Sequence, residues 1–245
     1  MARPYVRKLY SDDVPPITWS VPGFGEALTR PLSSDPDTGA STQLVELPPG
    51  WAAPAGRFGA ALELLVVEGT ITLGEFRLKR FSYSYVPPRV CAGPWSTAAG
   101  ARLLWMGGAN LDFRAGEAAG IETSSPHWIP QIDPSALPWQ PTLTPGFPLG
   151  AMRKTLRIDP DTGAGTWLLG MLPQVRETRR EIHPTAEEAF TLLGESVSDR
   201  GVSRPGEYFW RPPFIPHGPF ETDVGVLTFF RTDGPLRTDY IWPEP

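Results

Sequence analysis

The hexapeptide DPDTGA occurs twice in this chain, at residues 35–40 and again at residues 159–164. Chance recurrence of a six-residue string is very improbable, so the repeat indicates an internal duplication. Asp-Pro opens a turn and glycine supplies a positive φ, while strand-like runs flank both copies. The hexapeptide is therefore predicted to be a hairpin turn. A calcium loop would need more oxygen ligands at regular spacing.

Other landmarks keep nearly the same offset. Gly69 closes the apolar run LELLVVEG, and Gly194 closes AFTLLGE 125 residues later. A Pro-Pro pair at 87–88 follows FSYSYV, and another at 212–213 follows GEYFWR at the same offset. The chain is predicted to be two copies of one unit of roughly 80 residues, large enough to enclose its own core.

Composition excludes several classes of function. Hydrophobic residues at 40% and aromatic residues at 11% describe a globular protein. A net charge of −5 offers no basic face to nucleic acid or to a membrane surface. Cys91 is the single cysteine, which excludes an internal disulfide and fits a reducing compartment. Without a signal core or an apolar run of about 20 residues, the chain is expected to be soluble and cytoplasmic.

Glycine and proline, 25 and 30 residues, divide the chain into short runs of aliphatic and aromatic residues. This pattern is typical of many strands joined by turns, and it predicts an all-β sandwich or barrel. We expect an N-terminal arm at 1–28, a first barrel at 29–112, a proline-rich linker at 113–150 and a second barrel at 151–245. The arm is expected to add an edge strand to the other unit.

Two of the three histidines lie in segments with regular spacing. In EIHPTAEEAFTLLGE (181–195), three residues separate His183 from Glu187, and six more lead to Gly194. In GEYFWRPPFIPHGPF (206–220), four residues separate Pro212 from His217. The third histidine, at position 127, lies in the linker and is expected to be exposed.

These two segments resemble the paired signature motifs of the cupin superfamily, whose members are small antiparallel jelly-roll barrels. The first motif runs His-x-His, three or four residues, Glu, six residues, Gly, and the second runs Gly, five residues, Pro, a spacer, His. The resemblance implies that His183, Glu187 and His217 bind a metal. Glu181 occupies the position of the first histidine, so a carboxylate as fourth ligand, or as a base beside the site, stays open.

Strand geometry supports this interpretation, because alternate residues of a strand face one side. Glu181 and His183 can thus both point into a barrel, where His217 arrives from a distant strand. Two imidazoles and a carboxylate form a facial ligand set with open positions. By the same alternation, Glu188 is expected on the surface. Arg179 shares the parity of Glu181 and is expected to reach the barrel mouth and meet an anionic substrate.

The resemblance covers about 40 residues in its motifs, and the duplication makes the whole chain resemble a bicupin. The residues within the motifs are similar to those of one cupin subgroup. This subgroup contains anti-sigma-factor cupins and cupin dioxygenases that act on small diketones or aromatic ketones. It implies one divalent metal ion, Fe(II) above Mn, Ni or Zn, and a small-molecule substrate. A metal-dependent dioxygenase is favoured, with a lyase or isomerase as related chemistry, and a homodimer is possible.

A cupin that only senses or binds a metal or small ligand is the alternative. Anti-sigma-factor cupins carry an additional helical domain, and this chain has no amphipathic segment long enough for one, which favours the enzyme.

The first copy has apolar or small residues at the ligand positions. Subtracting 125 places Gly56, Phe58, Leu62 and Ala92 opposite the four candidate ligands of the second copy. None of these side chains can bind a metal, and apolar replacements convert a cavity into core. The first barrel is therefore predicted to be degenerate, with no metal ligands.

Overall fold

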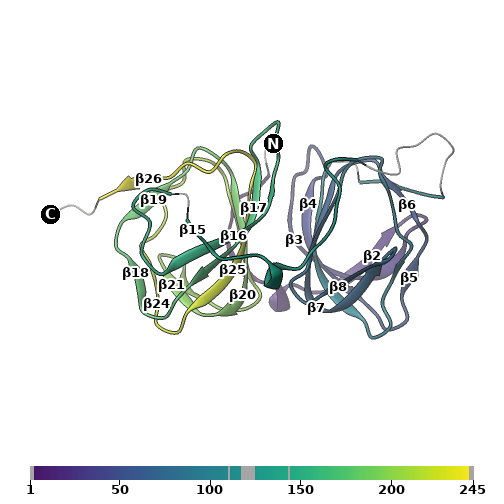
Figure 1. The fold of residues 1–245 in the computed structure, drawn as a ribbon, viewed down its shortest axis with the longest axis horizontal. Helices are drawn as coiled ribbons and strands as arrows, with labels where there is room; N and C mark the ends of the chain where they lie inside the picture. Colours follow the sequence, from purple (N-terminus) through teal and green to yellow (C-terminus); the bar gives the residue numbers. More distant parts are fainter. Residues whose placement is uncertain (1–2, 110, 117–124, 143, 243–245) are drawn as a thin grey trace. The chain divides into compact units, whose positions relative to one another are not determined.

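The structure is a computed structural model that describes residues 3–109, 111–116, 125–142 and 144–242. The described residues are all-β as predicted, apart from two short 3-10 turns. They divide into two compact units (Figure 1). Unit 1 comprises Val14–Ala136 with Arg3, and unit 2 comprises Pro4–Asp13 and the chain from Leu137 onward. No helix among the described residues has the length and apolar character needed to cross a bilayer.

Unit 1 is built from short antiparallel strands and one 3-10 turn. Its elements are β2 (Ile17–Val21), β3 (Gly25–Ser34), β4 (Ser41–Leu47), β5 (Ala52–Ala53), β6 (Gly56–Phe58), β7 (Leu62–Leu73), β8 (Phe76–Lys79), β9 (Tyr83–Val86), β10 (Cys91–Ala92), β11 (Trp95–Ser96), β12 (Ala101–Gly107), β13 (Phe113–Ala115), β14 (Ile129–Ile132) and η2 (Pro134–Ala136).

Unit 2 repeats this organisation. Its elements are β1 (Val6–Tyr10), η1 (Ser11–Asp13), β15 (Gln140–Pro141), β16 (Ala151–Ile158), β17 (Gly165–Met171), β18 (Val175–Glu177), β19 (Arg180–Ile182), β20 (Glu187–Gly194), β21 (Ser196–Ser198), β22 (Gly201–Ser203), β23 (Glu207–Arg211), β24 (Phe220–Thr222), β25 (Val226–Thr232) and β26 (Asp239–Ile241).

The main sheets of the two units have the same strand order. In unit 1 the order is β14-β9-β7-β12-β4-β3-β2, and in unit 2 it is β1-β23-β20-β25-β17-β16-β15. Strands that correspond in the two sequence copies occupy the same position in the two strand orders. The duplication seen in the sequence is thus a duplication of the fold, and the chain consists of two tandem jelly-roll barrels.

The repeated hexapeptide forms the same hairpin turn in both units, as predicted. It joins β3 to β4 and β16 to β17. The Asp35 amide donates to the carbonyl oxygen of Ala40 at 2.8 Å, and the Asp159 amide donates to that of Ala164 at 2.8 Å. The glycine in each turn has a φ near 70° (75° at Gly39, 70° at position 163), a conformation in which other residues are strained.

An edge strand of each main sheet comes from the sequence that precedes the other copy. β1, in the N-terminal arm, pairs with β23 of unit 2. β14, which follows the first copy in sequence and lies in the segment 113–150, pairs with β9 of unit 1. The edge strand expected from the arm is therefore present. The segment 113–150 also contributes β13, which pairs with β6, and β15, which pairs with β16.

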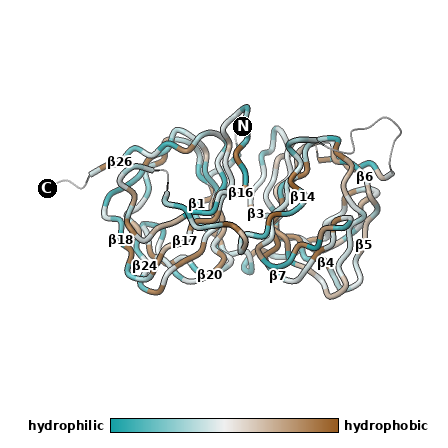
Figure 2. The backbone as a smooth tube through the Cα atoms, viewed as in Figure 1, coloured by the Kyte–Doolittle hydropathy of each residue, from teal (hydrophilic) through white to brown (hydrophobic). Residues whose placement is uncertain are grey.

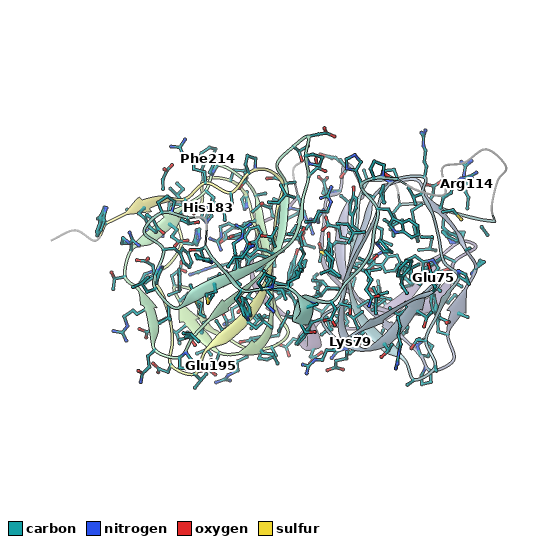
Figure 3. All side chains as sticks on the ribbon, viewed as in Figure 1. Glu75, Lys79, Arg114, His183, Glu195 and Phe214 are labelled. Carbon is teal, nitrogen blue, oxygen red and sulfur yellow. The ribbon has the colours of Figure 1, made fainter. Side chains whose placement is uncertain are left out.

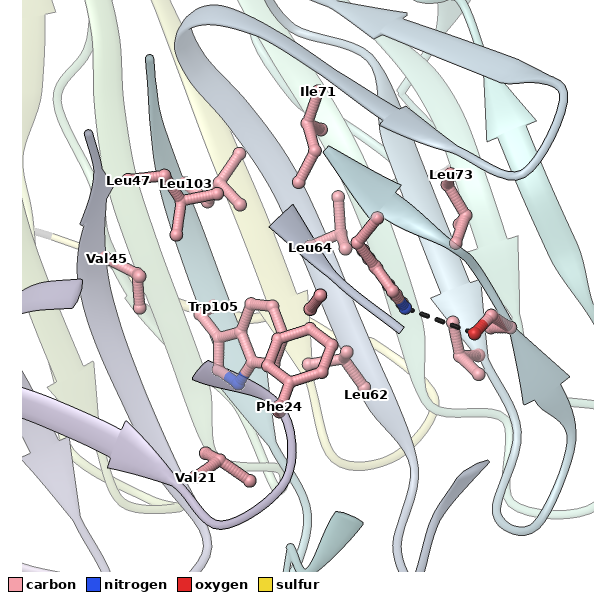
Figure 4. Packing of buried hydrophobic residues seen from close by; sticks show 14 of the residues in the cluster. Val21, Phe24, Val45, Leu47, Leu62, Leu64, Ile71, Leu73, Leu103 and Trp105 are labelled. Atoms are coloured by element: carbon pink, nitrogen blue, oxygen red, sulfur yellow. Dashed lines mark hydrogen bonds between the residues drawn. The ribbon is translucent and has the colours of Figure 1, made fainter. Parts of the chain in front are cut away.

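The interior of unit 1 is filled by aromatic side chains. Figure 4 shows Phe24 against Trp105, with Leu62 and Leu64 from β7 beside them. The ring of Phe24 lies within 5.7 Å, centroid to centroid, of its neighbours Phe58 (5.2 Å) and Trp105 (5.7 Å). Such offset and edge-to-face pairs fill space densely. Packed side chains therefore fill the interior of this barrel.

Apolar and polar stretches are interspersed along the chain in both units (Figure 2). Unit 2 has a smaller described cluster, formed by Ala151, Met171, Val175 and Val226. The remaining interior of unit 2 encloses a cavity that contains the candidate ligands.

Candidate metal centre

Backbone pairing brings the candidate ligands of unit 2 together. Glu181 lies on β19, and its amide donates to the carbonyl oxygen of His217 at 2.8 Å, while the His217 amide donates back at 2.9 Å. His183 follows β19 directly, two residues after Glu181, and so shares its face. Figure 3 places His183 in unit 2. Residues far apart in sequence thus meet at one point.

The side chains converge on that point. Within the described residues, Glu181, His183 and His217 form the group of ligand atoms able to hold a metal ion, with all three atoms within 4.8 Å of one another. Glu181 Oε2 lies 3.8 Å from Nε2 of each histidine. The two imidazole rings are 4.9 Å apart between centroids. Glu181 and His183 are each only 5% exposed, so the group lies inside the barrel.

Both histidines present Nε2 as the free ring nitrogen. His183 Nδ1 lies 3.0 Å from the carbonyl oxygen of Arg237, and His217 Nδ1 lies 3.1 Å from that of Ile215. A carbonyl oxygen only accepts a hydrogen bond, so Nδ1 carries the proton in each ring. The Nε2 lone pairs then point at the shared site, which is the orientation that a metal-binding histidine requires.

Two observations fit a bound cation. Glu181 Oε1 is buried and has no hydrogen-bond partner among the described residues, which is costly unless a cation or water meets it. The separations of 3.8 Å are also close to the ~3–4 Å expected between donor atoms that each lie about 2.1 Å from one ion. The residues present therefore fit a divalent metal.

The two carboxylates have opposite pKa shifts. Burial, reinforced by the negative charge of Glu187, raises the pKa of Glu181 to about 8. Burial is the largest influence on Glu187 and acts to raise its pKa, but the positive charges of Arg211, the two histidines and Arg200 together outweigh it, and this pKa is lowered. The pKa of His217 falls to about 3, first because of burial and then because of Arg211. The metal-free site thus favours neutral Glu181, neutral His217 and charged Glu187.

Glu187 stands beside the three-residue group. Its Oε1 lies 4.0 Å from His183 Nε2, and its Oε2 lies 3.4 Å from Arg211 Nη2. The residues 187 and 211 face each other across β20 and β23. In unit 1 the equivalent register pair is Leu62 and Val86, both fully buried. An ion pair of the second barrel is therefore an apolar pair in the first.

The same contrast holds around the interior. At an offset of 125, many core residues of unit 1 correspond to residues that line the cavity of unit 2. Among these core residues are Phe58, Leu62, Trp95, Trp105 and Phe113, and their counterparts are His183, Glu187, Phe220, Phe230 and Thr238. Ala92, opposite His217, is also core. The positions whose side chains line the candidate site in unit 2 thus carry core side chains that fill the interior of unit 1.

The cavity of unit 2 has a volume of about 130 Å³. An apolar cavity of about 150 Å³ holds benzene, so the space suits a small organic molecule. Its apolar wall is formed by Phe147, Trp167, Leu169, Met171, Phe209, Phe220, Val226, Phe230 and Leu236. Its polar wall holds the four candidate ligands and three arginines at positions 153, 200 and 211.

Two side chains do not lie where the sequence analysis predicted. Arg179 is not among the cavity-lining residues. Its guanidinium bonds the buried Glu177 at 2.5 Å and 2.7 Å and stacks 3.6 Å from the ring centroid of Tyr240. The surface position expected for Glu188 is wrong, because this side chain is 4% exposed and accepts hydrogen bonds from Tyr208 and Arg231. It faces away from Glu187 but is covered.

The buried arginines were missed by sequence reasoning. Arg211 is 4% exposed, and arginine is rarely so buried unless it is paired. A signal was present in the comparison of the two copies, since Val86 stands at the position that corresponds to Arg211. His127, by contrast, is exposed as expected.

Comparisons with solved structures agree with this architecture. A "putative dioxygenase" from Nostoc punctiforme has 30% identity and a TM-score of 0.89, covering 99% of this chain and 88% of that chain. The Escherichia coli protein Ylba has 18% identity and a TM-score of 0.64, covering 92% and 89%. Oxalate decarboxylase from Lactobacillus farciminis, solved as a formate complex, has 10% identity and a TM-score of 0.62, covering 96% and 88%. The last two show the fold alone.

No curated protein matches the chain. The family model described as "Domain of unknown function (DUF4437)" matches residues 17–239, which is nearly the whole chain. Together with the two jelly-roll barrels and the cupin-fold neighbours, this match shows that the chain belongs to the DUF4437 family within the cupin superfamily.

Proposed function

We propose that the protein is a mononuclear, metal-dependent dioxygenase that acts on a small organic molecule such as a diketone or an aromatic ketone. The observation that carries the proposal is the convergence of two correctly oriented imidazoles and a buried carboxylate inside an apolar cavity. The Nostoc punctiforme relative, described as a "putative dioxygenase", supports the same reaction class.

Glu181, His183 and His217 would hold the ion, and Glu187 would complete the set through its Oε1. Such a set leaves positions open for substrate, and a bound Fe(II) would supply the redox chemistry with dioxygen. Fe(II) is favoured because two imidazoles and a carboxylate with open positions are typical of non-haem Fe(II) oxygenases. Mn, Ni and Zn share these ligand preferences.

The chain's own residues define the rest of the chemistry. The carbonyl oxygens of Arg237 and Ile215 hold the histidine tautomers, and Arg211 is the largest of the positive influences that keep Glu187 charged. The aromatic wall excludes water from the reacting atoms. For a 1,3-diketone, R–CO–CH₂–CO–R′ and O₂ would give R–COOH and OHC–CO–R′, so that both oxygen atoms enter the products and no other reductant is needed.

The experiment combines metal analysis with oxygen uptake. Plasma mass spectrometry of the purified protein is expected to find about one metal ion per chain. His183→Ala should abolish it, while the matched control His127→Ala, at an exposed position, should keep it.

The Fe(II)-loaded protein should then consume one O₂ per diketone or aromatic ketone cleaved, in an oxygen-electrode screen. The absence of uptake with every diketone, hydroxyketone and catechol tested would contradict the dioxygenase. Two metal ions per chain would contradict a single working barrel.

A further inference from the structure

Two arginines of unit 2 have guanidinium donors that the protein itself does not satisfy. Arg211 is 4% exposed, and its Nε and Nη1 have no hydrogen-bond partner among the described residues. Arg200 likewise has a buried Nε without a partner. Both residues line the cavity of unit 2. A buried, unsatisfied guanidinium N–H is costly, so an acceptor that enters the cavity, a bound anion or a water, would stabilise each arginine.

The two cations contact the same aromatic ring. Both lie against the ring of Phe209, with guanidinium carbons 4.0 Å and 4.6 Å from its centroid for Arg200 and Arg211. Their carboxylate neighbours are at ion-pair distance only, because Arg200 is 3.6 Å from Glu207 and Arg211 is 3.4 Å from Glu187. Neither arginine has a close hydrogen bond to its neighbouring carboxylate, and such a pair of cations favours the binding of an anion.

The balance of buried charge points the same way. Five charged side chains with little exposure line the cavity, namely Arg153, Arg200, Arg211, Glu181 and Glu187, and Glu207 lies at ion-pair distance from Arg200. Their formal charges cancel, so a divalent ion at the proposed centre leaves two positive charges. The exposed Asp199 at the rim offsets at most one of them.

We propose that Arg200 and Arg211 form an anion subsite that binds the carboxylate of a small organic acid, so that the substrate is a ketone or diketone that carries a carboxylate group. The assignment of the substrate rests on the proposed function, whereas the subsite itself does not. Unit 1 provides an internal contrast, since Val86 replaces Arg211 in the barrel whose interior is packed.

Calorimetric titration with benzoate and with the isosteric, neutral benzamide tests the subsite. The full-length protein is titrated both Zn²⁺-loaded and chelator-treated, because Zn²⁺ has no redox chemistry. Benzoate is expected to bind at least tenfold more tightly than benzamide in both forms. Arg211→Gln should remove this preference, and Arg176→Gln, a matched change of the exposed arginine on β18, should keep it.

Equal affinity for benzoate and benzamide in the parent protein would overturn the subsite, as would an Arg211→Gln variant that keeps the preference. Tighter binding of inorganic phosphate than of benzoate would overturn the carboxylate assignment. If circular dichroism shows that Arg211→Gln does not fold, Arg200→Gln is measured in its place with the same two readings. If the protein does not bind Zn²⁺ but still prefers benzoate to benzamide, the metal proposal is overturned and the anion subsite is not.

Discussion

Metal binding at the proposed centre should release a proton from Glu181, and this gives the site a defined pH dependence. The pKa of Glu181 is raised to about 8 by burial and by Glu187, so in the metal-free protein the neutral acid dominates at neutral pH. A metal requires the carboxylate. Because the raised pKa opposes ionisation, the apparent metal affinity should rise as the pH rises toward 8 and then level off.

The magnitude follows from the ionised fraction of Glu181. With a pKa of about 8, this fraction is about 1% at pH 6 and about 24% at pH 7.5, and each pH unit corresponds to ~1.4 kcal/mol. The Zn²⁺ affinity should therefore increase about 25-fold between these two pH values through this residue alone. At pH 7 about 0.9 proton should leave per ion bound, which calorimetry in two buffers of different ionisation enthalpy measures.

Two variants separate this effect from other contributions. Glu181→Gln cannot release the proton, so the difference in pH slope between it and the parent protein isolates residue 181. Glu187→Gln should weaken binding but retain most of the slope, because Glu187 is already charged and because burial, the larger cause of the raised pKa of Glu181, remains when this negative charge is removed. The reasoning is refuted if Glu181→Gln keeps the slope of the parent protein, or if Glu187→Gln is the variant that loses it.

Three further outcomes follow from the packing. Phe58→Ala should destabilise unit 1 by about 3–5 kcal/mol in urea denaturation, since it opens a cavity at a fully buried ring; metal content should not change, and a loss below 1 kcal/mol would contradict this role. Ending the chain after Leu236 removes the carbonyl that holds His183 Nδ1 together with β26, the partner of β19, and metal affinity should fall about 10- to 100-fold or more; unchanged affinity would show that neither contact is needed to hold the site. Tyr83→Phe removes a 2.7 Å hydrogen bond to the buried Glu63 and should cost about 1–3 kcal/mol in the same denaturation assay, with a neutral result excluding a contribution from that bond.

The fold could be predicted because its determinants are local and occur twice. The turn at residues 35–40 contains the residues that determine its conformation, an aspartate that accepts hydrogen bonds from backbone amides and a glycine at positive φ. The convergence of His183 and His217 could be predicted from motif spacing, since spacing along a strand fixes the side on which a residue lies. Apolar counterparts such as Phe58 indicated which barrel is packed.

The misses have a common physical origin. Alternation predicts which face of a strand a residue occupies, but not whether that face is covered by another layer. Glu188 does lie opposite Glu187, yet it is buried because Tyr208 and Arg231 close over it. Arg211 reads as an ordinary surface residue, and only its counterpart Val86 marks the position as interior. Spacing also cannot distinguish an arginine that enters the cavity from one such as Arg179, which is held by its near neighbour Glu177.

The reciprocal edge strands have a consequence for synthesis. Val6 of β1 pairs with Trp210 of β23, roughly 200 residues later, so β1 waits without this partner until β23 emerges from the ribosome. The sheet of unit 1 is complete once β14 has been made. The packed barrel can therefore mature early, while the barrel with the cavity depends on a strand made before the first barrel, and deletion of β1 would damage the barrel that is farther from it in sequence.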